Sequence, residues 1–138
     1  MKIISSICLV MLACLASSGC GRTDKFDRLV LSGQVTYDGQ PVPFGSIWFE
    51  PRAAVGQLAP PGFAIIRDGH FETTRRDAPV AGPHLIRISG YPDEKPQDED
   101  EAERQILFPE YTMEMELSPA ETVLNVDVPR RKTGSSGR

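Results

Sequence analysis

The chain has 138 residues, and its 15 basic and 19 acidic side chains give a formal net charge of −4. A weakly acidic chain lacks the basic surface that phosphate binding requires, so we expect no nucleic-acid partner. Twelve glycines and twelve prolines favour many turns and disfavour a helical bundle.

Residues 1–19 have the layout of a secretory signal peptide. Lys2 gives a basic start, residues 3–15 are almost wholly apolar, and small residues occupy 16–19. The apolar run is shorter than the roughly 20 residues that a membrane-spanning helix needs, and no later segment is long and apolar enough to span. The sequence therefore predicts an exported chain without a transmembrane helix.

Cys20 follows this leader, and residues 15–21 resemble a bacterial lipobox. The resemblance implies that Cys20 becomes the new N-terminus and carries fatty acyl chains such as palmitate, since two or more chains give stable attachment. Ser17 stands where a lipobox usually has Leu, and Cys14 is a rival site that would leave a shorter apolar region. Gly21 is not the Asp that commonly retains lipoproteins at the inner membrane. We therefore expect a lipid anchor in the cell envelope. The outer membrane is favoured over the inner membrane, and both its periplasmic and its surface face stay as alternatives.

The remaining chain is predicted to contain a short polar tether over residues 20–28 and one domain over residues 29–128. All three cysteines lie in or directly after the leader, at positions 8, 14 and 20. The domain has none, so its fold must be held by core packing without disulfides.

The domain alternates between apolar and polar residues with a period of two, which is typical of half-buried strands. Asp38-Gly39 and Asp68-Gly69 predict two-residue hairpin turns, because both residue types tolerate positive φ. Residues 40–43 contain two prolines and are not expected to continue a central strand, because proline donates no hydrogen bond. The predicted strands span residues 31–37, 46–50, 63–67, 70–74, 84–89, 113–117 and 122–128.

Two segments stand apart from this pattern. Residues 93–103 are strongly acidic with almost nothing apolar, which predicts a mobile excursion, with a helical turn near residues 101–106. Residues 129–138 form a basic, Gly/Ser-rich tail that is expected to be disordered. Seven short strands with turn chemistry between them predict an all-β sandwich or small barrel.

The segment Ser32–Pro43, followed by Gly45–Pro51, resembles the opening of carboxypeptidase regulatory-like domains and, more narrowly, of transthyretin-like bacterial lipoproteins. The similarity continues at Asp68–Phe71, Gly82–Gly90 and Phe108–Tyr111. It implies a seven-stranded, prealbumin-like (Ig-like, Greek-key) sandwich after a lipoprotein signal peptide, and little about activity. His84 departs from this family, which usually has an aromatic residue there.

No catalytic apparatus is evident, so we expect a non-enzyme without cofactors. His70 follows a hairpin turn and is expected to be exposed, whereas His84 is expected to pack at an edge or in the core. No Gly-x-Ser-x-Gly motif is present. Transthyretin-related hydroxyisourate hydrolases end in Tyr-Arg-Gly-Ser, whereas this chain ends in residues 132–138 without that motif.

The sequence therefore leaves binding hypotheses. The first is a non-catalytic envelope module for protein interaction or structural assembly. The second is carbohydrate binding, with Trp48 and Tyr91 as stacking residues. The third is a calcium-responsive acidic loop at 93–103, although the spacing of a calcium loop is missing, so no metal ligands are assigned. Contact of the basic residues 130–132 with an anionic surface polymer is a weaker alternative.

Overall fold

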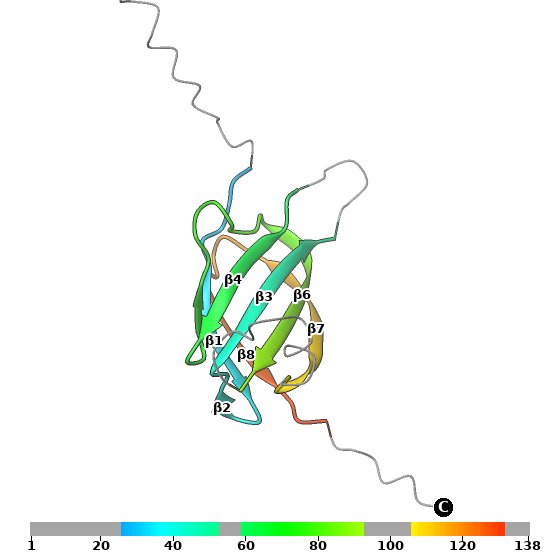
Figure 1. Cartoon of the computed structure of the whole chain (residues 1–138). Helices are drawn as coiled ribbons and strands as arrows, with labels where there is room; N and C mark the ends of the chain where they lie inside the picture. The colour runs from blue at the N-terminus through cyan, green and yellow to red at the C-terminus, as the bar shows by residue number, and fades with distance from the viewer. Residues whose placement is uncertain (1–25, 53–58, 93–105, 132–138) are drawn as a thin grey trace, which may run out of the picture.

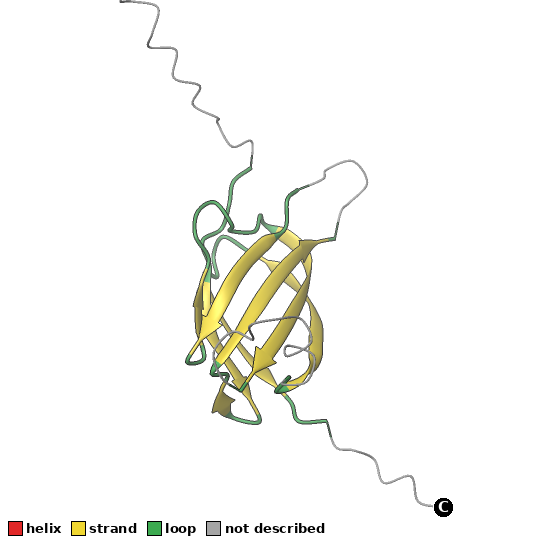
Figure 2. Ribbon diagram, in the orientation of Figure 1, coloured by secondary structure: helices red, strands yellow, loops and turns green. Residues whose placement is uncertain are grey.

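The computed structural model describes residues 26–52, 59–92 and 106–131, and in these ranges every regular element is a strand. The prediction of an all-β fold is therefore confirmed (Figure 2). The strands are β1 (Ser32–Tyr37), β2 (Gln40–Pro41), β3 (Phe44–Pro51), β4 (Gly62–Arg67), β5 (His70–Glu72), β6 (Gly82–Tyr91), β7 (Phe108–Leu117) and β8 (Val123–Val128).

The strands of the described chain form one curled sheet. Pairing runs in the order β2-β1-β5-β4-β3-β6-β7, and β8 pairs with the other edge of β1. All pairs are antiparallel except β1 with β8, which is parallel. In Figure 1 β4, β3 and β6 lie in front, β7 curves round the right-hand side, and β1 and β8 lie behind. The sheet thus folds back on itself and encloses one core.

The core lies between these front and back layers. Ile47 and Phe49 of β3 and Ile86 and Ile88 of β6 are fully buried, which matches the face predicted for them. The remaining buried members are Leu31, Val35, Val42, Ala64, Ile66, Phe71, Phe108, Leu117, Leu124, Val126 and Val128. No cysteine lies among the described residues, so apolar packing is what joins the two layers.

Both predicted hairpin turns are confirmed. Asp38 and Asp68 have φ of 51° and 49°, and the glycine after each has φ of 77°. This backbone matches the right-handed strand twist, and Asp and Gly tolerate it. Residues 40–43 do not continue a central strand, as predicted, although Gln40–Pro41 forms the two-residue edge strand β2, which pairs with β1 through Thr36↔Pro41 and Tyr37↔Gln40. Next to a two-residue turn the second pair exchanges no ladder hydrogen bonds, so the missing N–H of Pro41 costs nothing.

Several strands extend beyond their predicted ends. The predicted strands 46–50 and 84–89 are too short because β3 pairs with β6 along the whole length of β3, from Phe44↔Tyr91 to Pro51↔His84, and β6 continues to Gly82 in its pairing with β7. The predicted strand 113–117 begins at Phe108, since an irregularity between Ile88 and Gly90 accommodates the preceding stretch of β7.

The predicted strand 70–74 is instead too long. It ends at Glu72, because the buried Thr73 turns its side chain to the start of β1. The Leu31 N–H donates to Thr73 Oγ1 at 2.8 Å, and the Thr73 N–H donates to the Leu31 carbonyl at 2.8 Å.

The parallel contact of β1 and β8 depends on a glycine. A Cβ atom on Gly33 would lie 1.7 Å from the backbone oxygen of Leu124. No side chain fits there, so Gly33 allows β8 to pass close to β1 and close the back layer.

The two ends of the described chain lie at opposite ends of the molecule (Figure 1). Arg28 forms a bridge with Val80, and the Leu29 N–H donates to the Pro79 carbonyl at 2.7 Å, so the domain begins at this end. The predicted leader, Cys20, the acidic run 93–103 and residues 132–138 of the tail lie outside the described residues.

Candidate functional site

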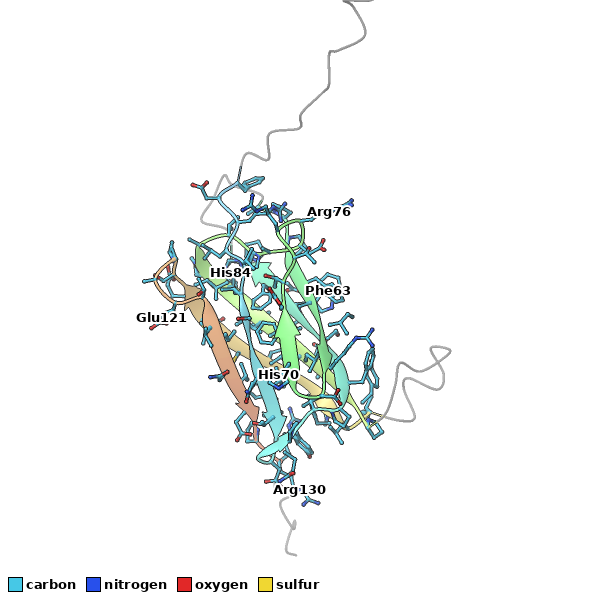
Figure 3. The ribbon with its side chains drawn as sticks, turned by 90° about the vertical axis from the view of Figure 1, so that its left-hand side faces the viewer. Phe63, His70, Arg76, His84, Glu121 and Arg130 are labelled. Atoms are coloured by element: carbon cyan, nitrogen blue, oxygen red, sulfur yellow. The ribbon has the colours of Figure 1, made fainter. Side chains whose placement is uncertain are left out.

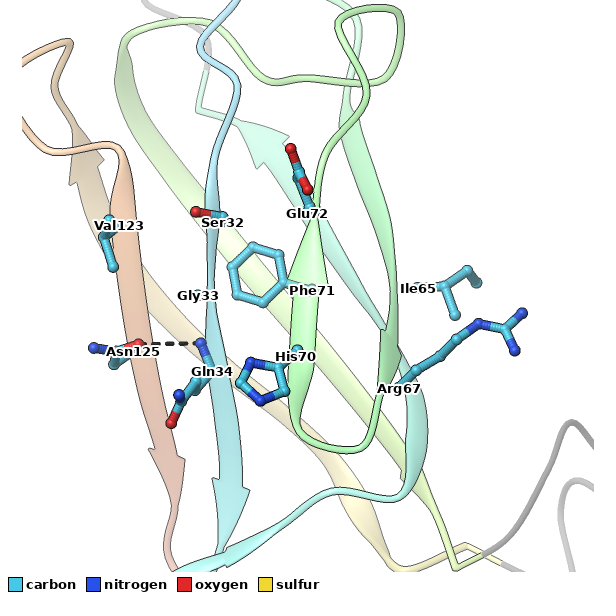
Figure 4. A pocket seen from close by; sticks show the side chains of 10 residues that line it. All are labelled: Ser32, Gly33, Gln34, Ile65, Arg67, His70, Phe71, Glu72, Val123 and Asn125. Atoms are coloured by element: carbon cyan, nitrogen blue, oxygen red, sulfur yellow. Dashed lines mark hydrogen bonds between the residues drawn. The ribbon is translucent and has the colours of Figure 1, made fainter.

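An open hollow of about 590 Å³ crosses the outside of β8, β1, β5 and β4. In Figure 4, Val123 and Asn125 project from β8 at one side, while Ile65 and Arg67 project from β4 at the other. The short strand β5 lies between, with His70 and Glu72 on its outer face. The hollow therefore lies over the three-residue strand β5, which is shorter than its neighbours β1 and β4.

The hollow presents mostly neutral hydrogen-bonding groups. Its lining includes the Ser32 hydroxyl and the Gln34 and Asn125 amides. Asn125 is held in place because its Oδ1 accepts from the Gln34 backbone N–H at 3.1 Å, which leaves its amide NH₂ to donate elsewhere. The lining also contains one carboxylate, Glu72, and one guanidinium, Arg67, whose formal charges cancel in number.

A second feature, which we call the aromatic face, is the outer surface of β3, β4 and β6. It consists of two ring pairs: Trp48 with Phe63, at a centroid distance of 4.5 Å, and Phe44 with Tyr91, at 6.3 Å. Trp48 is 43% exposed, although its strand lies in the middle of the sheet. A large apolar ring left open at such a position is available for stacking.

Charged side chains border the Trp48–Phe63 pair in a compensated arrangement. Arg87 is the cross-strand partner of Trp48. Its Nη1 donates to Glu110 Oε1 at 2.9 Å, and its Nε lies 2.7 Å from Glu50 Oε1 in an ion pair that is not aligned as a hydrogen bond. Glu110 first, and Glu50 second, raise the pKa of Arg87 above its usual value. The guanidinium therefore stays charged and is held between two carboxylates.

The hollow and the aromatic face adjoin along β4. Ile65, which is 38% exposed, and Arg67 line the hollow. Both lie on the same outer face of β4 as Phe63, because the three residues are two positions apart. The Arg67 guanidinium also lies 5.7 Å from the centre of the Phe44 ring. The two features thus make one continuous outer surface.

The two histidines occupy opposite sides of the sheet. His70 is exposed in the hollow, as expected, and His84 is 1% exposed in the interior (Figure 3). His84 Nδ1 lies 2.9 Å from the Gly82 carbonyl, and its buried Nε2 has no hydrogen-bond partner. Within the described ranges neither ring is hydrogen-bonded to a hydroxyl group. The arrangement offers no activated nucleophile there.

A smaller hollow of about 420 Å³ lies at the end where the described chain finishes, between the start of β7 and the end of β8. It is lined by Tyr37, Tyr111, Arg130 and Arg131, among others. The predicted basic tail begins here, but Arg130 Nη1 already lies 3.8 Å from Asp38 Oδ2. Lys132, the third basic residue of that prediction, lies outside the described residues.

The structure places the two predicted stacking residues on the same outer surface. Trp48 pairs with Phe63 and Tyr91 with Phe44. Sequence reasoning missed both partner rings, the Arg87 ion pairs and the whole hollow. Alternation along the strand predicts that Arg87 lies on the other face of the sheet from Ile86 and Ile88. Its position beside Trp48 depends on how β3 and β6 pair.

The described ranges contain no group of three or more side chains arranged to ligate a metal ion, and the acidic run proposed for calcium lies outside them. In the same ranges no helix has the length and apolar character needed to cross a membrane. No family model matches the chain, and neither a curated protein nor a solved structure does so.

Proposed function

We propose that this protein is a non-catalytic module of the cell envelope, held to a membrane by lipid on Cys20, that recognises another envelope component. The observation that carries the proposal is the Trp48–Phe63 pair on a central part of the sheet, in which Trp48 is 43% exposed and Phe63 is half-buried. A ring pair there adds little to the core, which lies on the other face. It is placed to contact a partner.

The proposed fold behind this surface is a prealbumin-like Greek-key sandwich of the transthyretin-like lipoprotein group. Support comes from the seven strands besides the two-residue β2 and from the buried residues that both layers contribute. The continuous pairing through β1 makes it a curled variant, in which the layers are parts of one sheet.

The proposed anchor suits this arrangement. The described N-terminal segment enters the domain at one end, beside Val80, whereas the strands that carry the hollow and the aromatic face run along its side (Figure 1). A lipid-anchored Cys20 would leave this side open to partners in the envelope.

The anchor is tested by metabolic labelling with palmitate in the bacterial host. We expect Cys20→Ser to abolish label incorporation and release the protein from membranes, because the thiol is the acceptor. Cys14→Ser is the matched control and should retain the label. Labelling that depends on Cys14 instead would overturn the assignment of the anchor.

Recognition is tested by capture from detergent-solubilised envelope with the full, lipidated chain. We expect the wild type to retain a component that the Trp48→Ala, Phe63→Ala double variant loses. Val30→Ala is the control, since Val30 is a comparably exposed apolar residue at 40% but lies outside the strands. Equal capture by all three proteins would contradict a role for the aromatic face.

A further inference from the structure

The outer surface carries information about the chemistry of its ligand. We propose that it binds a neutral polysaccharide, which stacks on the Trp48–Phe63 pair and reaches with its hydroxyl groups into the hollow. This inference rests on the proposed recognition function and names the class of ligand.

The first argument is charge. On the aromatic face the Arg87 guanidinium is already paired with Glu50 and Glu110. In the hollow the lining holds one cation, Arg67, and one anion, Glu72, so their formal charges cancel in number. The surface therefore offers no excess positive charge to an anionic polymer and little excess negative charge to a cationic one. An uncharged ligand meets no electrostatic penalty here.

The second argument is the kind of polar group. The hollow contains the amides of Gln34 and Asn125 and the hydroxyl of Ser32. Amides and hydroxyls both donate and accept hydrogen bonds, as sugar hydroxyl groups do, so the two sets can pair completely. His70 adds a ring nitrogen at the rim, and no hydrogen bond or ion pair within the described ranges occupies it.

The third argument is the shape of the apolar part. A pyranose ring has one face of C–H groups, and such a face packs on an aromatic ring. The open rings are flanked by paired charges rather than by a broad apolar area, with Ile65 as the large exposed aliphatic neighbour. The ion pairs of Arg87 and the amides of the hollow interrupt the apolar groups of this surface, whereas the centre of a stable protein interface is depleted of charged residues. The observations therefore favour a sugar ring over a protein surface.

The fourth argument is extent. From Trp48 on β3 to Asn125 on β8 the surface crosses β4, β5 and β1. Four strand spacings make roughly 19 Å around the curve of the sheet. A single sugar would contact only part of this surface, so the ligand is a chain of several sugar units.

The test is a carbohydrate array probed with the full, lipidated chain in detergent micelles. The array holds neutral glucans, mannans and xylans beside polygalacturonate and chitosan as anionic and cationic polymers. We expect retention on at least one neutral polymer and none on the charged ones.

Two variant pairs connect binding to the surface. Trp48→Ala should weaken binding about ten-fold or more, while Val30→Ala leaves it unchanged. Gln34→Ala should weaken binding by about three-fold or more, while Gln40→Ala, an exposed amide on β2 outside the hollow, has no effect. A thermal melt of each variant shows whether it is folded.

Failure of this inference is distinguishable from failure of the proposed function. Retention only on charged polymers, binding that survives Trp48→Ala, or no retention at all would overturn the neutral polysaccharide. If the envelope capture then yields a protein that depends on Trp48 and Phe63, the recognition function stands and its ligand class is wrong. If nothing depends on these residues in either experiment, both proposals fall.

Discussion

The inner and outer faces of the β3–β6 pair are built from alternate residues of the same strands, yet they differ in burial, in charge and in the groups that they contact. On the inner face Ile47, Phe49 and Ile86 are fully buried members of the apolar core. On the outer face Trp48 and Arg87 are open to solvent and contact rings and carboxylates. Adjacent residues of one strand thus belong to different faces: one face stabilises the fold, and the other is proposed to bind a ligand.

The comparison teaches that stability and recognition can be changed independently in this protein. An inner side chain removed from a close-packed core leaves a cavity, whereas an outer side chain removed from the surface leaves water. Substitutions on the two faces should therefore separate in their effect on unfolding and on binding.

The largest expected effect comes from neighbouring residues on β3. Phe49→Ala should lower the free energy of unfolding by about 3–5 kcal/mol, because it empties a fully buried site. Trp48→Ala should lower it by less, about 1–2 kcal/mol, because the ring is 43% exposed and its removal leaves no enclosed cavity. Denaturant unfolding measures both. Similar losses at the two positions would break the comparison.

A smaller effect, an increase in stability instead of a loss, is expected at His84, with His70 as the comparison. His84→Phe should raise the free energy of unfolding by about 1 kcal/mol, since the buried Nε2 lacks a partner and its removal outweighs the loss of the Nδ1 contact. His70→Phe, on the exposed side, should leave stability unchanged. Destabilisation by His84→Phe would mean that the imidazole is needed in the interior.

The smallest effect is expected at the Arg87 ion pairs. Arg87→Met should change the free energy of unfolding by less than about 1 kcal/mol, because Arg87, Glu50 and Glu110 are all partly exposed and water screens their attraction. Chemical unfolding by urea at low and high salt provides the measurement. A loss comparable to that of Phe49→Ala would show that the outer face also holds the fold.

The local structure was largely predictable from the sequence. Asp-Gly pairs specify their own turn backbone, and the alternation of Ile86 and Ile88 with Arg87 gave the correct inward face. The ends of the strands were less predictable. β3 continues through Pro51, beyond the predicted strand 46–50, and β7 begins at Phe108 instead of residue 113 because its pairing with β6 is irregular there.

The candidate site was predictable only as single residues. Trp48 and Tyr91 stand out by type, but their neighbours come from other strands. The pairing of Trp48 with Phe63 and with Arg87 is set by the register of β3 against β4 and β6, which no local pattern encodes. The hollow likewise depends on the approach of β8 to β1 at Gly33, a contact between residues far apart in the chain.

The most direct test of the account is to map the binding surface by nuclear magnetic resonance. The isotope-labelled full chain in micelles would be titrated with polysaccharide isolated from the envelope. The account predicts that the Trp48 indole N–H and the amides of Gln34 and Asn125 shift together, while the buried and opposite-end residues do not. Shifts confined to the hollow lined by Tyr111 and Arg130, or no shift at Trp48 in the presence of a retained ligand, would contradict it.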